Sequence, residues 1–361
     1  MRPLHVLACC ALAAACGDLD DVQLTATPDG RLSAIIGGAP SEVDDYRPVG
    51  VLLIVGQDPW NGGAFASMMC SGTLIAPDTV LLAAHCIDDE TLSWFGSDYT
   101  LYFSFSLDVA SFGQTTLDLP PETYTVASVV ECPGFDIWAM DGSVPGPGDY
   151  KDLGIVFLAQ AVLDRAPAMV MGPNDSAALQ VGAEVAIVGY GQRSPEASFD
   201  PQDVGVKYQA MSIINELGVS EMQIGNVAPT PQKCHGDSGG PTFLTYIDGY
   251  SPADRLIGVT SHAYDESDCY KGGVDTRIDA YRDWIDSTLT SACSQGQRVA
   301  CENGGGLAVP ALAPAGSSSG SYYRRRRTPD SGCAGAGGAG LAPAVAVLAL
   351  LCTARRRRRS A

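Results

Sequence analysis

The chain has 361 residues, of which 46% are hydrophobic and 17% are charged, so it is long enough to bury a large core. Its formal net charge is −19, and residues 35–290 alone carry 10 Lys and Arg against 35 Asp and Glu, a net of −25. Nucleic-acid binding requires clustered cations that face phosphate, so this composition argues against nucleic acid as a partner. We expect instead a soluble, exported protein whose molecules are kept apart by their own charge.

The first 16 residues have the pattern of a short signal peptide. One positive charge is followed by an apolar run that ends in small residues. The end of this run, Ala13 to Cys16, also resembles a lipobox in which Cys16 would be lipidated, although Ala13 stands where leucine is usual. Residues 17–34 are polar and acidic without periodicity, and we interpret them as a propeptide or linker.

From residue 35 to about residue 280 the chain is a succession of short β-like runs separated by Gly, Pro and Asp. Such runs, rich in Val, Ile, Tyr and Phe, are typical of all-β barrels or sandwiches and not of βαβ units. The predicted strands include Val49–Val55, Ser71–Ile75, Thr79–Ala83, Tyr99–Leu107, Val126–Val130, Leu153–Leu158, Glu184–Tyr190, Val206–Ile214 and Leu256–Ser261. The segment Asp279–Leu289 has apolar residues at helical spacing, which predicts a single C-terminal helix.

Seven cysteines lie outside the two ends of the chain, and in an oxidising compartment most of them should form disulfides. Because seven is odd, at least one is free or pairs with something outside the chain. Cys70 and Cys86 could close a hairpin that holds His85 rigidly. The seven are Cys70, Cys86, Cys132, Cys234, Cys269, Cys293 and Cys301.

Three side chains are candidates for catalysis through serine, which needs a base for the hydroxyl proton and an acid that orients the base. Ser238 lies in a Gly-Asp-Ser-Gly-Gly stretch, whose backbone can point successive N–H groups into one concavity. His85 ends a predicted strand beside a cysteine. Asp152 leads into the apolar run Leu153–Leu158, where an ionised carboxylate needs a partner, whereas the alternative, Asp149, lies in a Gly/Pro-rich loop.

Four motifs in this order resemble the trypsin/chymotrypsin family of serine endopeptidases. They are Ile-Ile-Gly-Gly from residue 35, Ala-Ala-His-Cys from residue 83, Asp-Leu-Gly-Ile-Val from residue 152 and Gly-Asp-Ser-Gly-Gly-Pro from residue 236. The resemblance covers residues 35–290 and implies two antiparallel six-stranded β-barrels, a site in the cleft between them and a C-terminal α-helix. It implies that His85 is the general base, Asp152 its orienting partner and Ser238 the nucleophile. The backbone N–H groups of Gly236 and Ser238 match the family's oxyanion hole.

The resemblance also concerns the cysteines. Two family disulfides match cysteines of this chain, Cys70–Cys86 and Cys234–Cys269. Three cysteines have no family counterpart that we can place, namely Cys132, Cys293 and Cys301. We expect Cys293 to pair with Cys132 or with Cys301.

Members of the family are activated by a cut before the first isoleucine of their Ile-Ile-Gly-Gly-like motif. Here the new α-amino group of Ile35 would form a buried ion pair with Asp237, the residue before the nucleophile. Ala34 precedes Ile35, where trypsin-type activation would need Lys or Arg, and the nearest arginine is Arg31. Either an elastase-like activator cuts after Ala34, or a cut at Arg31 is followed by trimming. An activating protease is therefore an expected partner.

The specificity pocket departs from that of trypsin. Gln232 stands at the pocket floor where trypsin has Asp, so a preference for Arg or Lys is not expected. Ala263 and Gly273 match the pocket walls and leave it open. Two hypotheses follow: a neutral Gln232 would favour small, apolar or amide side chains, or an inward Lys233 would favour acidic ones. We prefer the first, because lysine normally extends to water.

The C-terminal part of the chain changes in composition. Residues 291–332 become rich in Gly, Ala, Pro and Ser and are predicted to be a linker. Residues 333–361 combine an uncharged run long enough to span a bilayer with Arg355–Arg359, which would lie in the cytoplasm. The pair Gly332-Cys333, the span and the arginines together resemble a bacterial sorting tail of the MYXO-CTERM type. The alternative is an ordinary membrane anchor, and both place the main domain outside the cytoplasm.

The sequence therefore predicts a secreted or surface-anchored serine endopeptidase, a monomer that acts on protein or peptide substrates. The alternative is a catalytically silent binding protein of the same fold, although such proteins usually lack a member of the triad. We expect no cofactor and no metal, since none of the His residues outside the signal peptide is spaced as one of a ligand pair. A calcium site on the acidic run Asp88–Glu90 stays open, and a solvated loop is the plainer interpretation.

Overall fold

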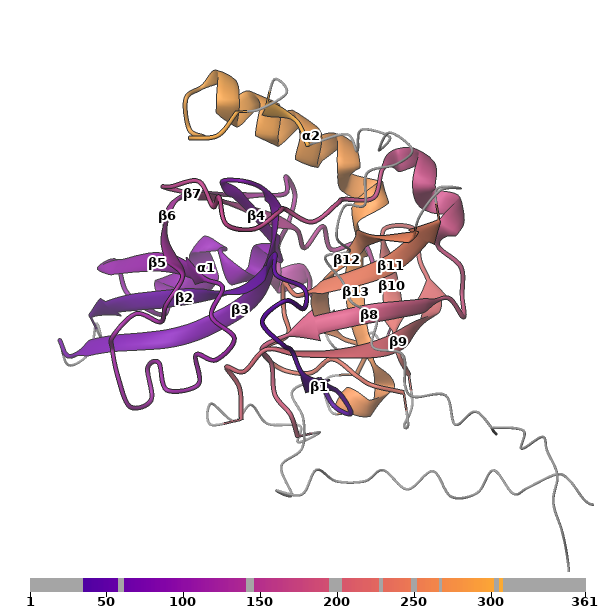
Figure 1. The fold of residues 1–361 in the computed structure, drawn as a ribbon, viewed down its shortest axis with the longest axis horizontal. Helices are drawn as coiled ribbons and strands as arrows, with labels where there is room; N and C mark the ends of the chain where they lie inside the picture. The colour runs from indigo at the N-terminus through magenta and orange to yellow at the C-terminus, as the bar shows by residue number, and fades with distance from the viewer. Residues whose placement is uncertain are drawn as a thin grey trace, which may run out of the picture. The chain divides into compact units, whose positions relative to one another are not determined.

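A computed structural model describes residues 35–57, 62–140, 146–194, 203–226, 230–247, 252–265, 268–301 and 305–307. These residues form two closed antiparallel β-barrels followed by a helix. Figure 1 shows the first barrel as strands coloured indigo to purple and the second as strands coloured rose to orange. The predicted fold class, two six-stranded barrels with a C-terminal helix, is confirmed.

The first barrel closes in the strand order β2-β3-β4-β7-β6-β5. Its strands are β2 (Val49–Gln57), β3 (Ala64–Ala76), β4 (Thr79–Leu82), β5 (Tyr99–Ser104), β6 (Thr123–Glu131) and β7 (Gly154–Leu158). In the antiparallel pair β4–β7, Leu82 at the end of β4 lies opposite Gly154 at the start of β7. Because His85 follows β4 and Asp152 precedes β7, this pairing brings both residues to the same edge of the barrel.

The second barrel is a sheet of order β9-β10-β13-β12-β11-β8 that closes through the pairing of β8 with β9. Its strands are β8 (Glu184–Gly189), β9 (Tyr208–Leu217), β10 (Glu221–Ile224), β11 (Pro241–Ile247), β12 (Pro252–Ala263) and β13 (Gly273–Arg277), and the short β1 (Ala39–Pro40) pairs with β9. The strands β1, β10, β11 and β13 are not among the strands named from the sequence. The hydrophobic pattern does not predict β10 and β13, because several of their buried side chains are polar, among them Glu221, Gln223 and Asp275.

Two helices accompany the barrels. The C-terminal helix α2 (Ile278–Ser294) extends beyond the predicted range, because Ala292 continues the buried stripe formed by Ile285 and Leu289. The short helix α1 (Asp89–Ser93) begins in the acidic run for which a calcium site was left open. The Asp88 carboxylate caps this helix by accepting from the backbone N–H groups of Glu90 and Thr91. The Oδ1 atom of Asp88 therefore serves to cap helix α1.

The segment after α2 begins with a strap that packs against the first barrel; we call residues 295–301 the C-terminal strap. The structure pairs Cys293 with Cys301, one of the two expected partners, and leaves Cys132 buried and free. The guanidinium of Arg298 donates to the buried Asp78 carboxylate at 2.8 and 3.0 Å. Asp78 lies in the β3–β4 turn, so this ion pair ties the C-terminal strap to the barrel that supplies His85.

No helix in the described ranges is long and apolar enough to cross a membrane. The predicted signal peptide, propeptide and sorting tail, at 1–16, 17–34 and 333–361, lie outside the described residues. So does most of the predicted linker beyond the C-terminal strap.

Replacing Arg298 with alanine is expected to lower the free energy of unfolding by about 3 kcal/mol, because it leaves the Asp78 carboxylate buried without its cation. The matched control, Arg47→Ala, removes a partly exposed ion pair with Asp164 and should cost less than about 1 kcal/mol. Urea unfolding measures both, in a Ser238→Ala background that prevents self-digestion. Equal losses for the two variants would contradict the structural role of the C-terminal strap.

Candidate active site

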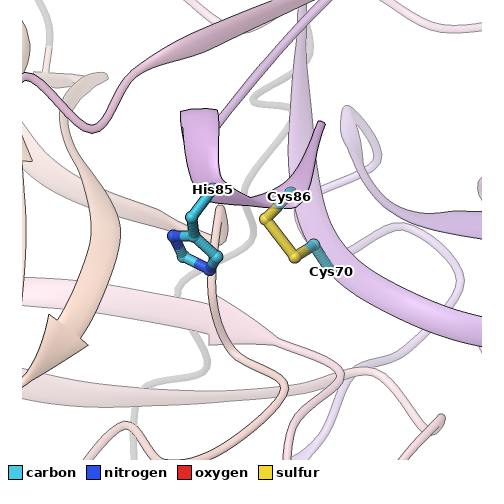
Figure 2. A group of neighbouring side chains, drawn as sticks. All are labelled: Cys70, His85 and Cys86. Carbon is cyan, nitrogen blue, oxygen red and sulfur yellow. A yellow bond between two sulfur atoms is a disulfide. The ribbon is translucent and has the colours of Figure 1, made fainter. Parts of the chain in front are cut away.

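His85 lies in a 3₁₀ turn, Ala84–Cys86, that directly follows β4. The predicted disulfide Cys70–Cys86 is present and ties this turn to β3. Figure 2 shows the imidazole and the disulfide leaving the turn in different directions, with the sulfur atoms on the side of the first barrel. The disulfide therefore restrains the backbone of His85 while the ring faces the second barrel.

Asp152 is fully buried and its carboxylate has three donors. The backbone N–H of His85 donates to Oδ1 at 2.9 Å, and the ring nitrogen Nδ1 of His85 lies 2.7 Å from Oδ2. The hydroxyl of Ser261, at the end of β12, donates to Oδ2 at 2.6 Å. The structure thus brings together two of the predicted triad residues and adds Ser261 from the second barrel.

The two groups shift each other's pKa in a consistent direction. Burial by itself would raise the pKa of Asp152, but the charge and hydrogen bond of His85 and the bond from Ser261 hold it below 3.8. Burial by itself would lower the pKa of His85, but Asp152 raises it above 6.5. The pair therefore contributes stability fully between pH 3.8 and 6.5, and loses it as pH falls through the lowered pKa of Asp152 or rises through the raised pKa of His85.

Ser238 lies half-buried in the loop between Gln232 and β11. Its carbonyl accepts from the N–H of Ser71 in β3 at 2.8 Å, and the N–H of Gly239 donates to Thr260 in β12 at 2.7 Å. Gly239 has φ +76°, and a Cβ there would lie 2.3 Å from the Ser71 carbonyl oxygen and 3.2 Å from the nitrogen of Ala83. Only glycine fits so close to the end of β4, and this approach places Ser238 beside the turn that carries His85.

The two predicted oxyanion donors lie in peptide groups whose carbonyls are already fixed. The carbonyl of His235 accepts from Gln192 at 2.7 Å, and that of Asp237 accepts from Gly240 at 2.8 Å. In a trans peptide the N–H points away from the carbonyl, so the N–H groups of Gly236 and Ser238 are aimed away from these partners. Gly236 takes φ +88°, which a residue with a side chain rarely adopts.

Asp237 is fully buried and is held by the backbone of its surroundings. Its carboxylate accepts from the N–H groups of Cys234 and Gly191, each at 2.9 Å. Burial raises the pKa of Asp237 to about 7, against the effect of these bonds. Ile35 is also fully buried, and Ile36 forms a β-bridge with Gln232, so the predicted activation residues lie along one stretch of the second barrel.

One of the predicted pocket residues, Lys233, is a member of a buried ion pair. Ala263 and Gly273 are partners in the β12–β13 ladder, and a Cβ on Gly273 would lie 3.3 Å from Cβ of Lys233. The sequence predicted that Lys233 extends to water, and this prediction is wrong: Lys233 is 3% exposed and donates to both oxygens of Asp275 at 2.8 Å. It also donates to the hydroxyls of Thr242 and Thr260 at 2.7 Å. Gln232 is buried beside it.

Sequence reasoning missed Ser261, Thr276 and Asp275. Ser261 is the last residue of the predicted strand Leu256–Ser261, but nothing in its local pattern indicates a bond to Asp152. Thr276 donates to the backbone carbonyl of Asp152 at 2.9 Å. Asp275 follows Gly273-Val274 in a short buried strand, and an acid in such a run is the same signal that singled out Asp152.

Two groups among the described residues bring a histidine close to two sulfur atoms: Cys70, His85 and Cys86, and Cys234, His235 and Cys269. In both groups the sulfurs are joined in a disulfide, as Figure 2 shows for the first, so they cannot act as thiolate ligands. The second group contains the other predicted disulfide, Cys234–Cys269.

Comparison with known proteins agrees with this arrangement. The profile of the Trypsin family matches residues 35–285. Phenoloxidase-activating enzyme 1 of Spodoptera litura is 25% identical over 72% of this chain and 67% of its own length. Anionic trypsin of Canis lupus familiaris is 25% identical over 81% of this chain and 99% of its own length. Human serine protease 56 is 27% identical over 63% of this chain, which spans only 36% of that longer protein.

A double β-barrel with a buried aspartate–histidine pair beside a Gly-Asp-Ser-Gly-Gly loop defines one class of hydrolase, the serine endopeptidases. The chain belongs to the trypsin family, whose profile covers most of its length.

In the unaltered protein, NMR titration of the His85 ring protons should give a pKa above 6.5. The variant Asp152→Asn should lower the pKa of His85, because burial is then opposed only by the weaker effect of the Asp88 charge. An unchanged pKa in the variant would contradict the coupling of the two groups.

Proposed function

We propose that Ser238, His85 and Asp152 form the catalytic triad of an endopeptidase that hydrolyses peptide bonds through an acyl-enzyme. The observation that carries this proposal is the 2.7 Å contact between Nδ1 of His85 and the buried Asp152 carboxylate. Because Nδ1 donates to Asp152, the neutral ring has its lone pair on Nε2, which can accept the proton of the Ser238 hydroxyl.

In the first half-reaction, Oγ of Ser238 attacks the substrate carbonyl carbon while Nε2 of His85 takes the hydroxyl proton. The carbonyl oxygen becomes an oxyanion, which accepts from the N–H groups of Gly236 and Ser238, each contributing about 3 kcal/mol to the transition state. His85 then gives its proton to the leaving amine, and the C–N bond breaks. Water repeats the sequence on the ester, and Asp152 stays ionised throughout.

Activation is proposed to use the α-amino group that a cut before Ile35 creates. The ammonium of Ile35 would pair with Asp237, whose buried carboxylate gains stability from a nearby positive charge. Since Asp237 directly precedes Ser238 and follows Gly236, this ion pair would hold both oxyanion donors in place. Ala34 before the cut requires an activator that cleaves after alanine, or a cut at Arg31 followed by trimming.

The proposed substrates have uncharged side chains at P1, the residue before the cleaved bond. An inward Lys233 was expected to favour acidic side chains, but its ammonium is compensated by Asp275 and two threonine hydroxyls. Asp275 is compensated in turn, so neither charge is available to a substrate. Small, apolar or amide side chains therefore suit the pocket beside Gln232.

The protein is proposed to act outside the cytoplasm, as a monomer on protein or peptide substrates. The signal-peptide pattern, the three disulfides of the described residues and the acidic composition support export. The charge-flanked apolar run at 333–361 supports delivery to the cell surface, either as a sorting tail or as an anchor. The name of the Spodoptera litura relative describes activation of another protein, and a role within a cascade is compatible with the proposed activation step.

The protein cut before Ile35 should be labelled on Ser238 by a fluorophosphonate. The variant Ser238→Ala should abolish labelling and lower peptidase activity on the order of 10⁴-fold or more, because the nucleophile is lost. The control Ser287→Ala, at an exposed position on α2, should keep both properties. A correctly cut, folded protein that neither labels nor hydrolyses peptides would support the silent binding protein instead.

A panel of peptides that differ only at P1 tests the pocket. Cleavage after Ala, Leu or Gln should exceed cleavage after Arg, Lys, Asp or Glu by at least about tenfold in kcat/KM, because a charge buried without a partner costs free energy. Lys233→Ser should raise cleavage after Arg relative to Leu, since Asp275 then lacks its cation. Fast cleavage after Arg or Lys by the unaltered protein would contradict the neutral pocket.

A further inference from the structure

The residues that precede Asp152 lead into the first barrel, yet the second barrel holds them. We call residues 147–152 the docked segment. At one end, Pro147 lies against Gly218, where a Cβ would come within 2.8 Å of it. At the other end, the hydroxyl of Thr276 in β13 donates to the carbonyl oxygen of Asp152 at 2.9 Å. The position of Asp152 therefore depends on contacts that the second barrel supplies.

The central anchor of the docked segment is the carboxylate of Glu221, the first residue of β10. The backbone N–H of Gly148 donates to Oε2 at 2.5 Å, and that of Tyr150 donates to Oε1 at 3.1 Å. Glu221 is fully buried. One carboxylate thus fixes two alternate peptide groups, the second of them only two residues before Asp152.

Neighbouring side chains complete this anchor. Glu221 lies directly opposite Thr276 in the β10–β13 ladder, so two facing residues hold two points of the docked segment. The Asp149 carboxylate between these points accepts from the hydroxyls of Ser220 at 2.7 Å and Tyr281 at 3.0 Å. Strand β10, strand β13 and helix α2 therefore act on the same short piece of chain.

The backbone of Lys151 links the anchor to Asp152. Lys151 has φ +57°, a left-handed conformation that is unfavourable for a residue with a side chain and persists only where its surroundings enforce it. This turn lies between Tyr150, which Glu221 holds, and Asp152, which His85 meets. Releasing Tyr150 would let Lys151 relax and would redirect the Asp152 carboxylate.

Glu221 is a costly choice if stability alone is considered. Burial raises the pKa of Glu221 to about 7, the two N–H donors oppose this, and the charges of Asp152 and Asp149 raise it further. A carboxylate buried beside two other carboxylates contributes little to stability compared with a well-packed apolar residue. Its place next to the predicted triad therefore points to a role in activity.

We propose that Glu221 is a positioning residue for catalysis, whose ionised carboxylate holds the docked segment so that Asp152 meets His85. The proposal rests on the proposed function of Ser238, His85 and Asp152 and adds to it a residue of β10. Glu221 touches no reacting atom; it acts through the backbone of Gly148 and Tyr150.

The variant Glu221→Gln keeps the shape of the side chain but replaces one acceptor oxygen with an NH₂ group, which cannot accept from a backbone N–H. In protein cut before Ile35, the rate constant of fluorophosphonate labelling should fall about tenfold at pH 8, with the final labelled fraction unchanged. Thr276→Val, which removes the bond to the Asp152 carbonyl, should slow labelling in the same direction. The control Glu216→Gln changes an exposed glutamate on β9 and should label at the rate of the unaltered protein.

The pH dependence of labelling separates positioning from general stability. In the unaltered protein the acid limb should reflect two groups, His85 and Glu221, whereas in Glu221→Gln it should reflect His85 alone. Asp149 and Asp152 are the acids of the docked segment that face Glu221. Both are present in the unaltered protein and in Glu221→Gln, so they do not account for a difference between the two acid limbs. A slowed Glu221→Gln whose acid limb matches that of the unaltered protein would overturn the proposal.

The outcomes distinguish this proposal from the proposed function. If neither the unaltered protein nor Glu216→Gln is labelled, the proposed function fails. If both are labelled and Glu221→Gln is labelled at the same rate, the positioning role is wrong. Should Glu221→Gln not fold, as judged by circular dichroism, Thr276→Val decides: slower labelling by a folded variant supports the role, and an unchanged rate overturns it.

Discussion

The Asp152 carboxylate is a fully buried charge whose three donors come from both barrels. The first barrel supplies the backbone and ring of His85, and the second supplies the hydroxyl of Ser261. A carboxylate buried without such partners costs several kcal/mol, so its ionised form is stable only when the two barrels pack in this register. The barrels therefore cannot separate without disturbing His85, the proposed base. Their separation would expose Asp152 and release His85, and it would move the proposed base away from Ser238.

Among the described residues of the second barrel, three other carboxylates are fully buried, and they are balanced in two ways. Asp275 is paired with Lys233, which makes the region beneath the proposed pocket neutral. Glu221 is balanced by two backbone N–H groups of the docked segment. Asp237 is also balanced by two backbone N–H groups, and burial raises its pKa to about 7, as it does the pKa of Glu221. A new ammonium at Ile35 would therefore yield more free energy beside Asp237 than beside Asp275, which already has its cation.

Local patterns predicted an all-β chain and singled out His85 and Asp152, because each residue flanks an apolar strand. The two-barrel fold and the pairing of His85 with Asp152 were implied by the resemblance of four motifs to the trypsin/chymotrypsin family. The direction of the Lys233 side chain was predicted wrongly. Lysine generally extends to water, but here the ammonium pairs with the buried carboxylate of Asp275, which lies 42 residues further along the chain. The pairing of Arg298 with Asp78 joins residues 220 positions apart. Such contacts depend on the register of strands and turns, which no local pattern contains. Glu221 was missed for the same reason: its partners are backbone groups of a distant loop.

The most direct test of the proposed triad is a crystal structure of the protein cut before Ile35 with a peptide boronate bound. We expect a bond between boron and Oγ of Ser238, with one boronate oxygen about 2.7–3.1 Å from the nitrogens of Gly236 and Ser238. We also expect the α-amino group of Ile35 at hydrogen-bond distance from the Asp237 carboxylate. A boronate bound elsewhere, or bound to Ser238 with the Gly236 N–H turned away from it, would contradict the proposed triad and its oxyanion hole.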